Sequence, residues 1–183
     1  MRAHRGAAGG GAGRPGPSGA VHVRVLVLGG TGTIGGPVLR RLVRSGHEVV
    51  ALAQSAASAA RARTEGASLV LAGDIGRPSD WLGQLPAVNA VVHMACDFAG
   101  AMAAVERRLL DGLLPRLADR PGRVRFIYTG GCWLFGTTGP DAADEDAPMR
   151  PLPAFAWMVP HAWRILSDPS VEGVVVHPGM VYG

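Results

Sequence analysis

The sequence predicts an α/β domain in which a parallel β-sheet is covered by helices on both faces. From His22 onward, short apolar and β-branched segments alternate with segments whose apolar residues recur at helical spacing. The short segments are apolar throughout rather than at every second residue, which is typical of strands buried on both faces. A length of 183 residues allows one such domain with a single core.

The strands and helices are expected to alternate along the chain. The first strand covers residues 22–28, and the helix after it covers residues 34–45 and ends at Gly46. The other expected strands are residues 47–53, 68–73, 87–95, 123–129 and 173–178. The other expected helices are residues 55–65, 79–85, 99–118 and 155–167. Pro115 is expected to kink or shorten the helix over 99–118, and residues 136–153 are expected to form a loop.

Composition and charge exclude several classes of function. Residues 1–20 are rich in Gly, Pro and Ala and hold three arginines without an acid, so a disordered leader is expected, with an organellar transit peptide as the alternative. Without those three charges the formal net charge of +4 becomes +1, and no nucleic-acid partner is predicted. No stretch of about 18 apolar residues is uncharged, which predicts no membrane partner. The two cysteines predict a cytoplasmic location rather than a disulfide framework, and no spacing predicts a metal site.

The strongest chemical signal is the glycine-rich turn after the first strand. The strand runs directly into GGTGTIGG (residues 29–36), and a helix follows. Glycines let a backbone turn tightly against a phosphate, and the free N–H groups of a helix N-terminus favour an anion. This is the position at which a doubly wound sheet binds the pyrophosphate of a dinucleotide. The predicted contacts are Gly29, Thr31, Gly32, Thr33, Ile34 and Gly35.

The sequence resembles the extended and atypical short-chain dehydrogenase/reductases, the NAD-dependent epimerase/dehydratase group, over residues 23–183. The glycines at 29, 32 and 35 match its GxxGxxG spacing. Four further landmarks follow in the family's order: Gly73-Asp74-Ile75, Val92-His93-Met94-Ala95, residues 127–136 and residues 176–183. The resemblance implies a Rossmann-type doubly wound sheet and a bound NAD or NADP. It also implies cofactor contacts from Asp74, Ile75, His93, Met94, Ala95, Pro178 and Gly179.

The end of the second strand should decide between the two cofactors. An acidic residue there would bind the ribose hydroxyls of NAD, whereas an arginine would favour the phosphate of NADP. The chain has Gln54, which is neither, and we expect it to contact the cofactor. Arg61 and Arg63 are close enough in sequence to reach a phosphate or, alternatively, form a solvated helix face. The prediction leans slightly to NADP.

The catalytic residues depart from the family pattern. Its members use a Ser or Thr, a Tyr and a Lys four residues after the Tyr, but this chain has no lysine. Counting along the pattern places Gly131 at the Ser position, with Thr129 as the nearest hydroxyl. The same count places Trp157 at the Tyr position and His161 at the Lys position. We therefore predict that Thr129 orients a substrate carbonyl and that His161 donates the proton. The alternatives are a strand-end hydroxyl and a helix-face histidine.

Three function classes are left open. The first is an oxidoreductase or epimerase with a non-standard active site, acting on a small molecule such as a carbonyl compound or a nucleotide sugar. The second is an NAD(P)-binding sensor or regulatory module without turnover. The third is a fragment of a longer enzyme, because Gly183 falls where the family's substrate domain begins. Residues 21–183 would then be an NAD(P)-binding domain truncated before the substrate domain, and a homodimer is left open.

Overall fold

The structure, a computed structural model, describes residues 22–96, 101–139, 142–179 and 181. Its six-stranded sheet is parallel throughout and has the order β3-β2-β1-β4-β5-β6. The order reverses between β1 and β4, which is the doubly wound arrangement that the sequence predicts. The strands are β1 (Arg24–Leu28), β2 (Glu48–Ala53), β3 (Leu69–Ala72), β4 (Ala90–His93), β5 (Val124–Thr129) and β6 (Val171–Val176).

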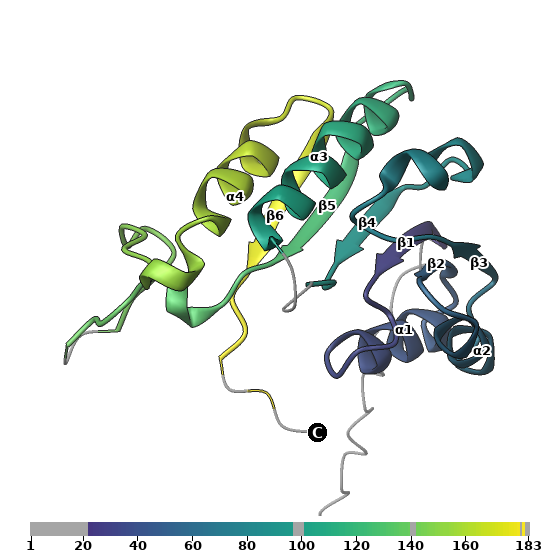
Figure 1. Ribbon diagram of the computed structural model, residues 1–183, viewed down its shortest axis with the longest axis horizontal. Coiled ribbons are helices and arrows are strands. Elements are labelled where there is room, and N and C mark those ends of the chain that lie inside the picture. Colours follow the sequence, from purple (N-terminus) through teal and green to yellow (C-terminus); the bar gives the residue numbers. More distant parts are fainter. Residues whose placement is uncertain (1–21, 97–100, 140–141, 180, 182–183) are drawn as a thin grey trace, which may run out of the picture.

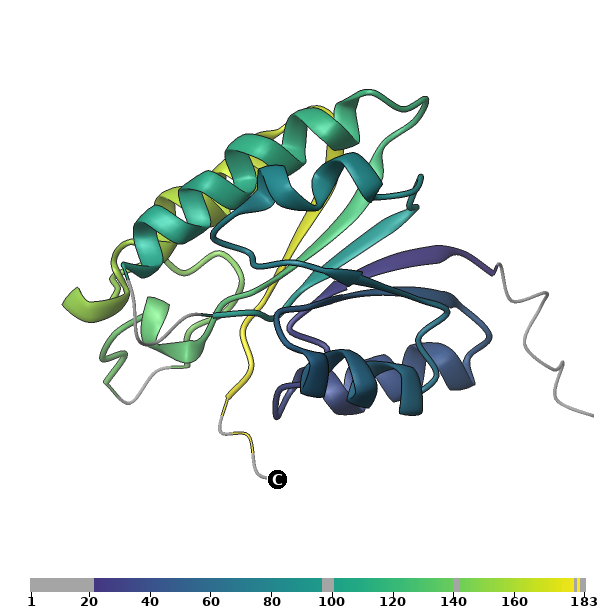
Figure 2. The ribbon, with the colours of Figure 1, turned by 45° about the vertical axis from the view of Figure 1, so that its right-hand side comes forward.

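Helices cover both faces of the sheet (Figures 1 and 2). The pair α1 (Gly35–Arg44) and α2 (Ala56–Thr64) lies on one face, and α3 (Met102–Ala118) and α4 (Met158–Ser167) lie on the other. Each face has its own core. Successive strand residues alternate between them, so that Val91 and Phe126 pack on the α3 side while Val92 and Ile127 pack on the α1 side. Burial on both faces explains why the central strands β1, β2 and β4 are almost entirely apolar.

Several elements differ from the sequence-based expectation. Helix α3 continues through Pro115 and ends at Ala118, the residue at which the sequence places its end, so the proline does not shorten it, and a kink there stays a prediction. Pro115 lies in the last turn, where one missing N–H costs a single hydrogen bond, and its own carbonyl still accepts from Asp119 N–H at 3.2 Å. Strand β6 begins at Val171, two residues earlier than expected. The expected leader, residues 1–20, lies outside the described residues.

The expected short helix over 79–85 is instead two 3₁₀ turns, Pro78–Asp80 and Leu82–Gln84. Trp81 lies between them, fully buried, and donates its indole N–H to the Asp74 carbonyl at 3.0 Å. The tryptophan therefore ties this segment to the end of β3. The described part of residues 136–152 contains neither helix nor strand, as expected for a loop, and a 3₁₀ turn follows at Pro153–Phe155.

All six strands end at the same edge of the sheet, because they are parallel. The segments that follow them therefore converge there, on either side of the point where the strand order reverses. Ligands of doubly wound sheets bind at this edge, outside the carboxyl ends of the strands. Within the described part of the chain, no helix is long and apolar enough to span a membrane.

Candidate functional site

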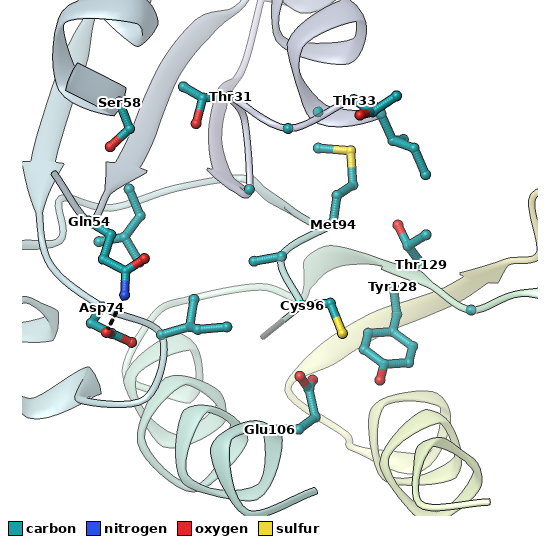
Figure 3. Close-up of a pocket in the computed structure, with 18 of the residues that line it drawn as sticks. Thr31, Thr33, Gln54, Ser58, Asp74, Met94, Cys96, Glu106, Tyr128 and Thr129 are labelled. Atoms are coloured by element: carbon teal, nitrogen blue, oxygen red, sulfur yellow. Dashed lines mark hydrogen bonds between the residues drawn. The ribbon is translucent and has the colours of Figure 1, made fainter. Parts of the chain in front are cut away.

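A cavity of about 650 Å³ lies at this edge of the sheet. Its volume is in the range of small-molecule and cofactor sites, ~300–1,000 Å³. Figure 3 shows two groups of side chains in it: Gln54, Ser58 and Asp74 on one side, and Met94, Cys96, Tyr128 and Thr129 on the other. The glycine-rich turn lies between the two groups and supplies Gly29, Thr31, Gly32, Thr33, Ile34 and Gly35 to the lining. All six of the residues that the sequence predicts in this turn thus face the cavity.

The turn brings the start of α1 into close contact with the end of β1. Gly29 has φ +82°, a conformation that favours glycine, and a Cβ there would lie 2.7 Å from the Ala95 nitrogen. A Cβ at Gly35 would lie 1.9 Å from the Gly29 carbonyl oxygen. No side chain caps the N-terminus of α1, and its first turn has no acidic residue. Gly36 donates its N–H to the Gly32 carbonyl at 2.9 Å and Pro37 has no N–H, so an anion in the cavity would meet the positive end of the helix dipole and the remaining N–H groups of the turn.

The side of the cavity at the carboxyl ends of β2 and β3 is polar, and its residues form hydrogen bonds with one another. Gln54 donates its side-chain amide to one oxygen of the Asp74 carboxylate at 2.7 Å. The other oxygen accepts the backbone N–H of Gly76 at 2.7 Å. Ile75 also lines the cavity. The predicted pair Gln54 and Asp74 is thus brought together, and both side chains are held in place by hydrogen bonds.

The N-terminus of α2 borders the same side. Ser55 caps it, and Ser55 and Ser58 form a reciprocal capping box. Both serines and Arg61 line the cavity, but Arg63 does not. The sequence offers no reason to prefer one arginine over the other, whereas in the structure only Arg61 is positioned to contact a ligand in the cavity.

The side of the cavity below β4 and β5 is mostly apolar and aromatic. The predicted residues Met94, Ala95, Thr129 and Pro178 line it, but Gly179 does not. Sequence reasoning missed most of the other lining residues on this side: Cys96, Glu106, Tyr128, Gly130, Trp133, Phe155, Trp157 and Met158.

Gly131, at the family's Ser position, is covered by an aromatic ring. A Cβ at Gly131 would lie 2.2 Å from the Trp133 indole, and that indole stacks on Phe155 with ring centroids 4.7 Å apart. A side chain at residue 131 and the indole of Trp133 therefore exclude each other. The hydroxyl groups that β5 brings to this part of the cavity are therefore those of Tyr128 and Thr129.

His161 lies behind the cavity wall rather than on it. The residue is 9% exposed, its ring contacts the backbone of Ala103 on α3, and the ring lies 6.0 Å from that of Trp157, which does line the cavity. Burial lowers the pKa of His161 below its ordinary value, and the nearby Glu106 carboxylate opposes this shift. The role of His161 as proton donor stays a prediction, since a direct contact with a ligand needs movement of the wall.

A buried acid–histidine pair lies beneath the apolar side. Both carboxylate oxygens of Glu106, on α3, are 3.0 Å from Nε2 of His93, at the end of β4. Glu106 lines the cavity, whereas His93 does not, although sequence reasoning placed His93 against the ligand. The Tyr128 ring meets the His93 ring edge-on at 5.5 Å. Burial, and then the Glu106 carboxylate, raise the pKa of Tyr128, so that its phenol stays neutral.

Glu106 did leave a signal in the sequence. It is in helical register with Leu109, Leu110 and Leu113, all fully buried. A carboxylate on such a face must find a partner, and the histidine that ends the neighbouring strand provides it. Among the residues that the structure describes, no group of three or more His, Cys, Asp or Glu side chains is arranged to hold a metal ion.

The sequence model of the NAD dependent epimerase/dehydratase family matches residues 25–166. Two curated relatives match as well. The 3-diazoavenalumate denitrifying reductase of a Streptomyces species is 29% identical over 88% of this chain and 57% of its own length. The photosystem II assembly factor Ycf39 of Synechocystis is 34% identical over 57% of this chain and 29% of its own length.

Solved structures share the fold. The UDP-Glc/GlcNAc 4-epimerase of Campylobacter jejuni superposes with a TM-score of 0.70 at 16% identity, over 84% of this chain and 52% of that one. The enzyme WbmG of Bordetella bronchiseptica, solved in complex with NAD, gives 0.63 at 18% identity, over 89% of this chain and 54% of that one. The chain thus spans about half the length of these structures.

The contact between the turn and α1 predicts unequal effects of two alanine substitutions. Gly35→Ala should destabilise the fold by about 2–4 kcal/mol, because its methyl group cannot coexist with the Gly29 carbonyl. Gly32→Ala is the control, since a Cβ at residue 32 would approach the same oxygen only to 3.4 Å, an ordinary contact. Denaturant unfolding of both variants measures the difference, and equal losses would contradict the packing described here.

Proposed function

Since the chain belongs to the NAD dependent epimerase/dehydratase family, we propose that its cavity binds NAD(P) and that the protein is an oxidoreductase or epimerase of the short-chain dehydrogenase type. The observation that carries the proposal is the position of the cavity. It lies at the reversal of the strand order, and the uncapped N-terminus of α1 opens into its centre. A dinucleotide bound there has its pyrophosphate at the helix and one nucleoside on each side.

The residues of the cavity fit such a ligand. Gly29 and Gly35 let the start of α1 pack against the end of β1, which brings the helix N-terminus to the cavity where a pyrophosphate would bind. The adenosine half would lie against Gln54, Asp74 and Ile75 on the polar side. The nicotinamide half would then lie on the apolar side, below β4 and β5.

The chemistry that NAD(P) supplies when bound is exchange of a hydride at its nicotinamide ring. The residues of this chain would orient the partner of that exchange. Thr129 is placed to bind a substrate oxygen, and the neutral phenol of Tyr128 is a second hydrogen-bond donor in the same half. The aromatic wall of Trp133, Phe155 and Trp157 would exclude water from the reacting atoms. His161 is proposed as the proton donor from behind this wall.

The proposed substrate class is based on the substrates named for similar proteins. One solved neighbour is an epimerase of UDP-Glc and UDP-GlcNAc, and one curated relative reduces 3-diazoavenalumate. A nucleotide sugar and a small carbonyl compound are therefore both proposed, and the aromatic wall favours the second. A cytoplasmic location and a homodimer stay predictions.

A binding module without turnover is the second candidate. The indole of Trp133 fills the space of a Ser at residue 131, and Trp157 stands at the position of the family's Tyr. Two of the family's three catalytic side chains are therefore replaced by groups that do not transfer protons at neutral pH. Saturable binding of NAD(P) without oxidation of NAD(P)H by aldehydes, ketones or nucleotide sugars would favour this candidate.

Cofactor binding tests the proposed function first. Gly32→Asp should abolish binding of both NAD and NADP, because its carboxylate would face the pyrophosphate across the turn. Gly32→Ala should weaken binding less than Gly32→Asp does, since it adds a methyl group to the turn without a charge. Calorimetric titration measures all three proteins. An unchanged affinity of a folded Gly32→Asp variant for NAD and NADP would contradict the proposal that the cavity binds a dinucleotide.

Arg61 lines the cavity and Arg63 does not, so substitutions at these two residues test the predicted preference for NADP. If Arg61 binds the 2′-phosphate together with Ser55 and Ser58, Arg61→Ala should weaken NADPH about 10- to 100-fold, the range of a charged hydrogen bond. NADH should bind as before. Arg63→Ala removes the same charge from the same helix outside the cavity and should change neither affinity. Equal effects of both variants on NADPH affinity would favour the alternative interpretation, in which Arg61 belongs to a solvated helix face.

Turnover tests His161. If it is the proton donor, His161→Gln should lower kcat by about 10²-fold or more, with cofactor affinity near wild type. The wild-type rate should fall as pH rises through the pKa of His161, because only the protonated ring donates. Since burial lowers that pKa, the fall should occur below the ordinary histidine value of about 6.5. Full activity of the variant with the substrate that the wild type uses would exclude this role.

A further inference from the structure

The aromatic wall of Trp133, Phe155 and Trp157 presents carbon atoms to the cavity. All three side chains line the cavity. The indole nitrogens of Trp133 and Trp157 are buried, and neither has a hydrogen-bond partner among the described residues. The parts of these indoles that line the cavity are therefore ring carbons. The ring of Phe155 stacks on that of Trp133 at 4.7 Å, with 26° between the planes. The wall thus offers an apolar ring a flat surface and gives it no side-chain hydrogen bond.

Hydrogen-bonding side chains on the same side gather at the ends of β4 and β5. Tyr128 and Thr129 bring hydroxyl groups from β5, and Cys96 brings a thiol from the segment after β4 (Figure 3). Both carboxylate oxygens of Glu106 lie 3.0 Å from the ring of His93. A ligand on this side therefore meets polar groups at one end and carbon along the aromatic wall. That distribution fits a molecule with one small polar group on an apolar body.

The apolar side has no net positive charge in the part of the chain that the structure describes. Among the described lining residues, Arg61 is the only arginine, and it lies on α2 at the opposite side. The chain has no lysine. The pair of His93 and Glu106 has no net charge if the imidazole is protonated and one negative charge if it is not, so neither state attracts an anion. A phosphate or carboxylate buried there would lack a counter-charge, which is costly.

Resting on the proposed function, we propose that the substrate is an uncharged aromatic aldehyde or ketone rather than a nucleotide sugar. Its ring lies against the aromatic wall, where contacts between aromatic rings strengthen binding by about two- to tenfold. Its carbonyl oxygen accepts a hydrogen bond from Thr129 at the end of β5. A nucleotide sugar would bring a diphosphate and several hydroxyl groups to a wall of carbon, and these groups would be left without partners.

The reaction balances with the proposed cofactor. The carbonyl carbon accepts a hydride from NAD(P)H, and the carbonyl oxygen accepts a proton from His161, the proposed donor, which solvent then protonates again. The π bond between carbon and oxygen breaks and a C–H and an O–H bond form. The aldehyde or ketone is thereby reduced to an alcohol, and NAD(P)H is oxidised to NAD(P)⁺.

Binding of three unreactive amides to the protein saturated with NAD(P)⁺, measured by NMR titration, separates charge from aromaticity. Benzamide is uncharged and aromatic, 4-carbamoylbenzoate adds a negative charge, and cyclohexanecarboxamide lacks the aromatic ring. Benzamide should bind at least about tenfold tighter than the carboxylate, because the apolar side offers no cation. It should bind about two- to tenfold tighter than the cyclohexane analogue. UDP-glucose should not displace it, and benzaldehyde should be reduced with one NAD(P)H oxidised per molecule.

Two tryptophan variants test the aromatic wall. Trp157→Leu keeps an apolar side chain in the cavity but removes an aromatic ring, so it should lower the preference for benzamide over cyclohexanecarboxamide at least about twofold. Trp163→Leu is the control, since Trp163 lies on α4, is 56% exposed and does not line the cavity, and the preference should be unchanged. If Trp157→Leu does not fold, Phe155→Leu makes the same test. An unchanged preference in the folded cavity variant would overturn the contact with the wall.

The other results that would overturn this proposal differ from failure of the proposed function. If the protein binds NAD(P)⁺ but binds the carboxylate as tightly as benzamide, or releases benzamide to UDP-glucose, the substrate class is wrong and the proposed function stands. If benzamide binds but no aromatic aldehyde or ketone is reduced, the compound is a ligand of a binding module and not a substrate. If the protein binds no NAD(P)⁺, the proposed function fails and this proposal fails with it.

Discussion

The close approach of the Gly29 carbonyl to the first residue of α1 is the contact on which the site depends. It leaves no room for a side chain at residue 35, and it brings α1 directly against the end of β1. The uncapped helix N-terminus therefore opens into the cavity at the reversal of the strand order. A helix that began farther from the strand would leave its N–H groups to water, and the two halves of the cavity would not meet around an anion site.

The two halves of the cavity differ in polarity because their functional side chains occupy different positions relative to the strands. On the β2–β3 side, polar residues stand just after the strands and bond to one another, as Gln54 and Asp74 do. On the β4–β5 side, His93 and Tyr128 near the strand ends point to the α3 face, on the same side as Val91 and Phe126. Both side chains are therefore buried, and Glu106 on α3 becomes the partner of His93. Hydrogen bonds between polar side chains hold one half of the cavity in place, whereas the other half is apolar and aromatic around one buried acid–histidine pair.

Local patterns in the sequence predict the fold and the first half of the site well. The apolar strands, the glycine-rich turn and the position of Asp74 depend on neighbouring residues, and the structure places them as expected. The second half depends on contacts between distant segments. The pairing of His93 with Glu106 and the packing of Trp133 over Gly131 join residues whose relation no spacing rule describes. For the same reason, counting along the family pattern reaches His161 but does not reveal that Trp157 lines the cavity whereas His161 does not.

The packing of Trp133 on Gly131 also constrains how this site can change over generations. A serine at residue 131 would collide with an indole that is held by stacking on Phe155, so this single substitution harms packing before it offers a hydroxyl. Replacement of Trp133 alone would open a void beside the glycine. Each step is unfavourable without the other, whereas the pair together is not, which is reciprocal sign epistasis. The tryptophan and the glycine are therefore expected to be inherited, and lost, as a unit.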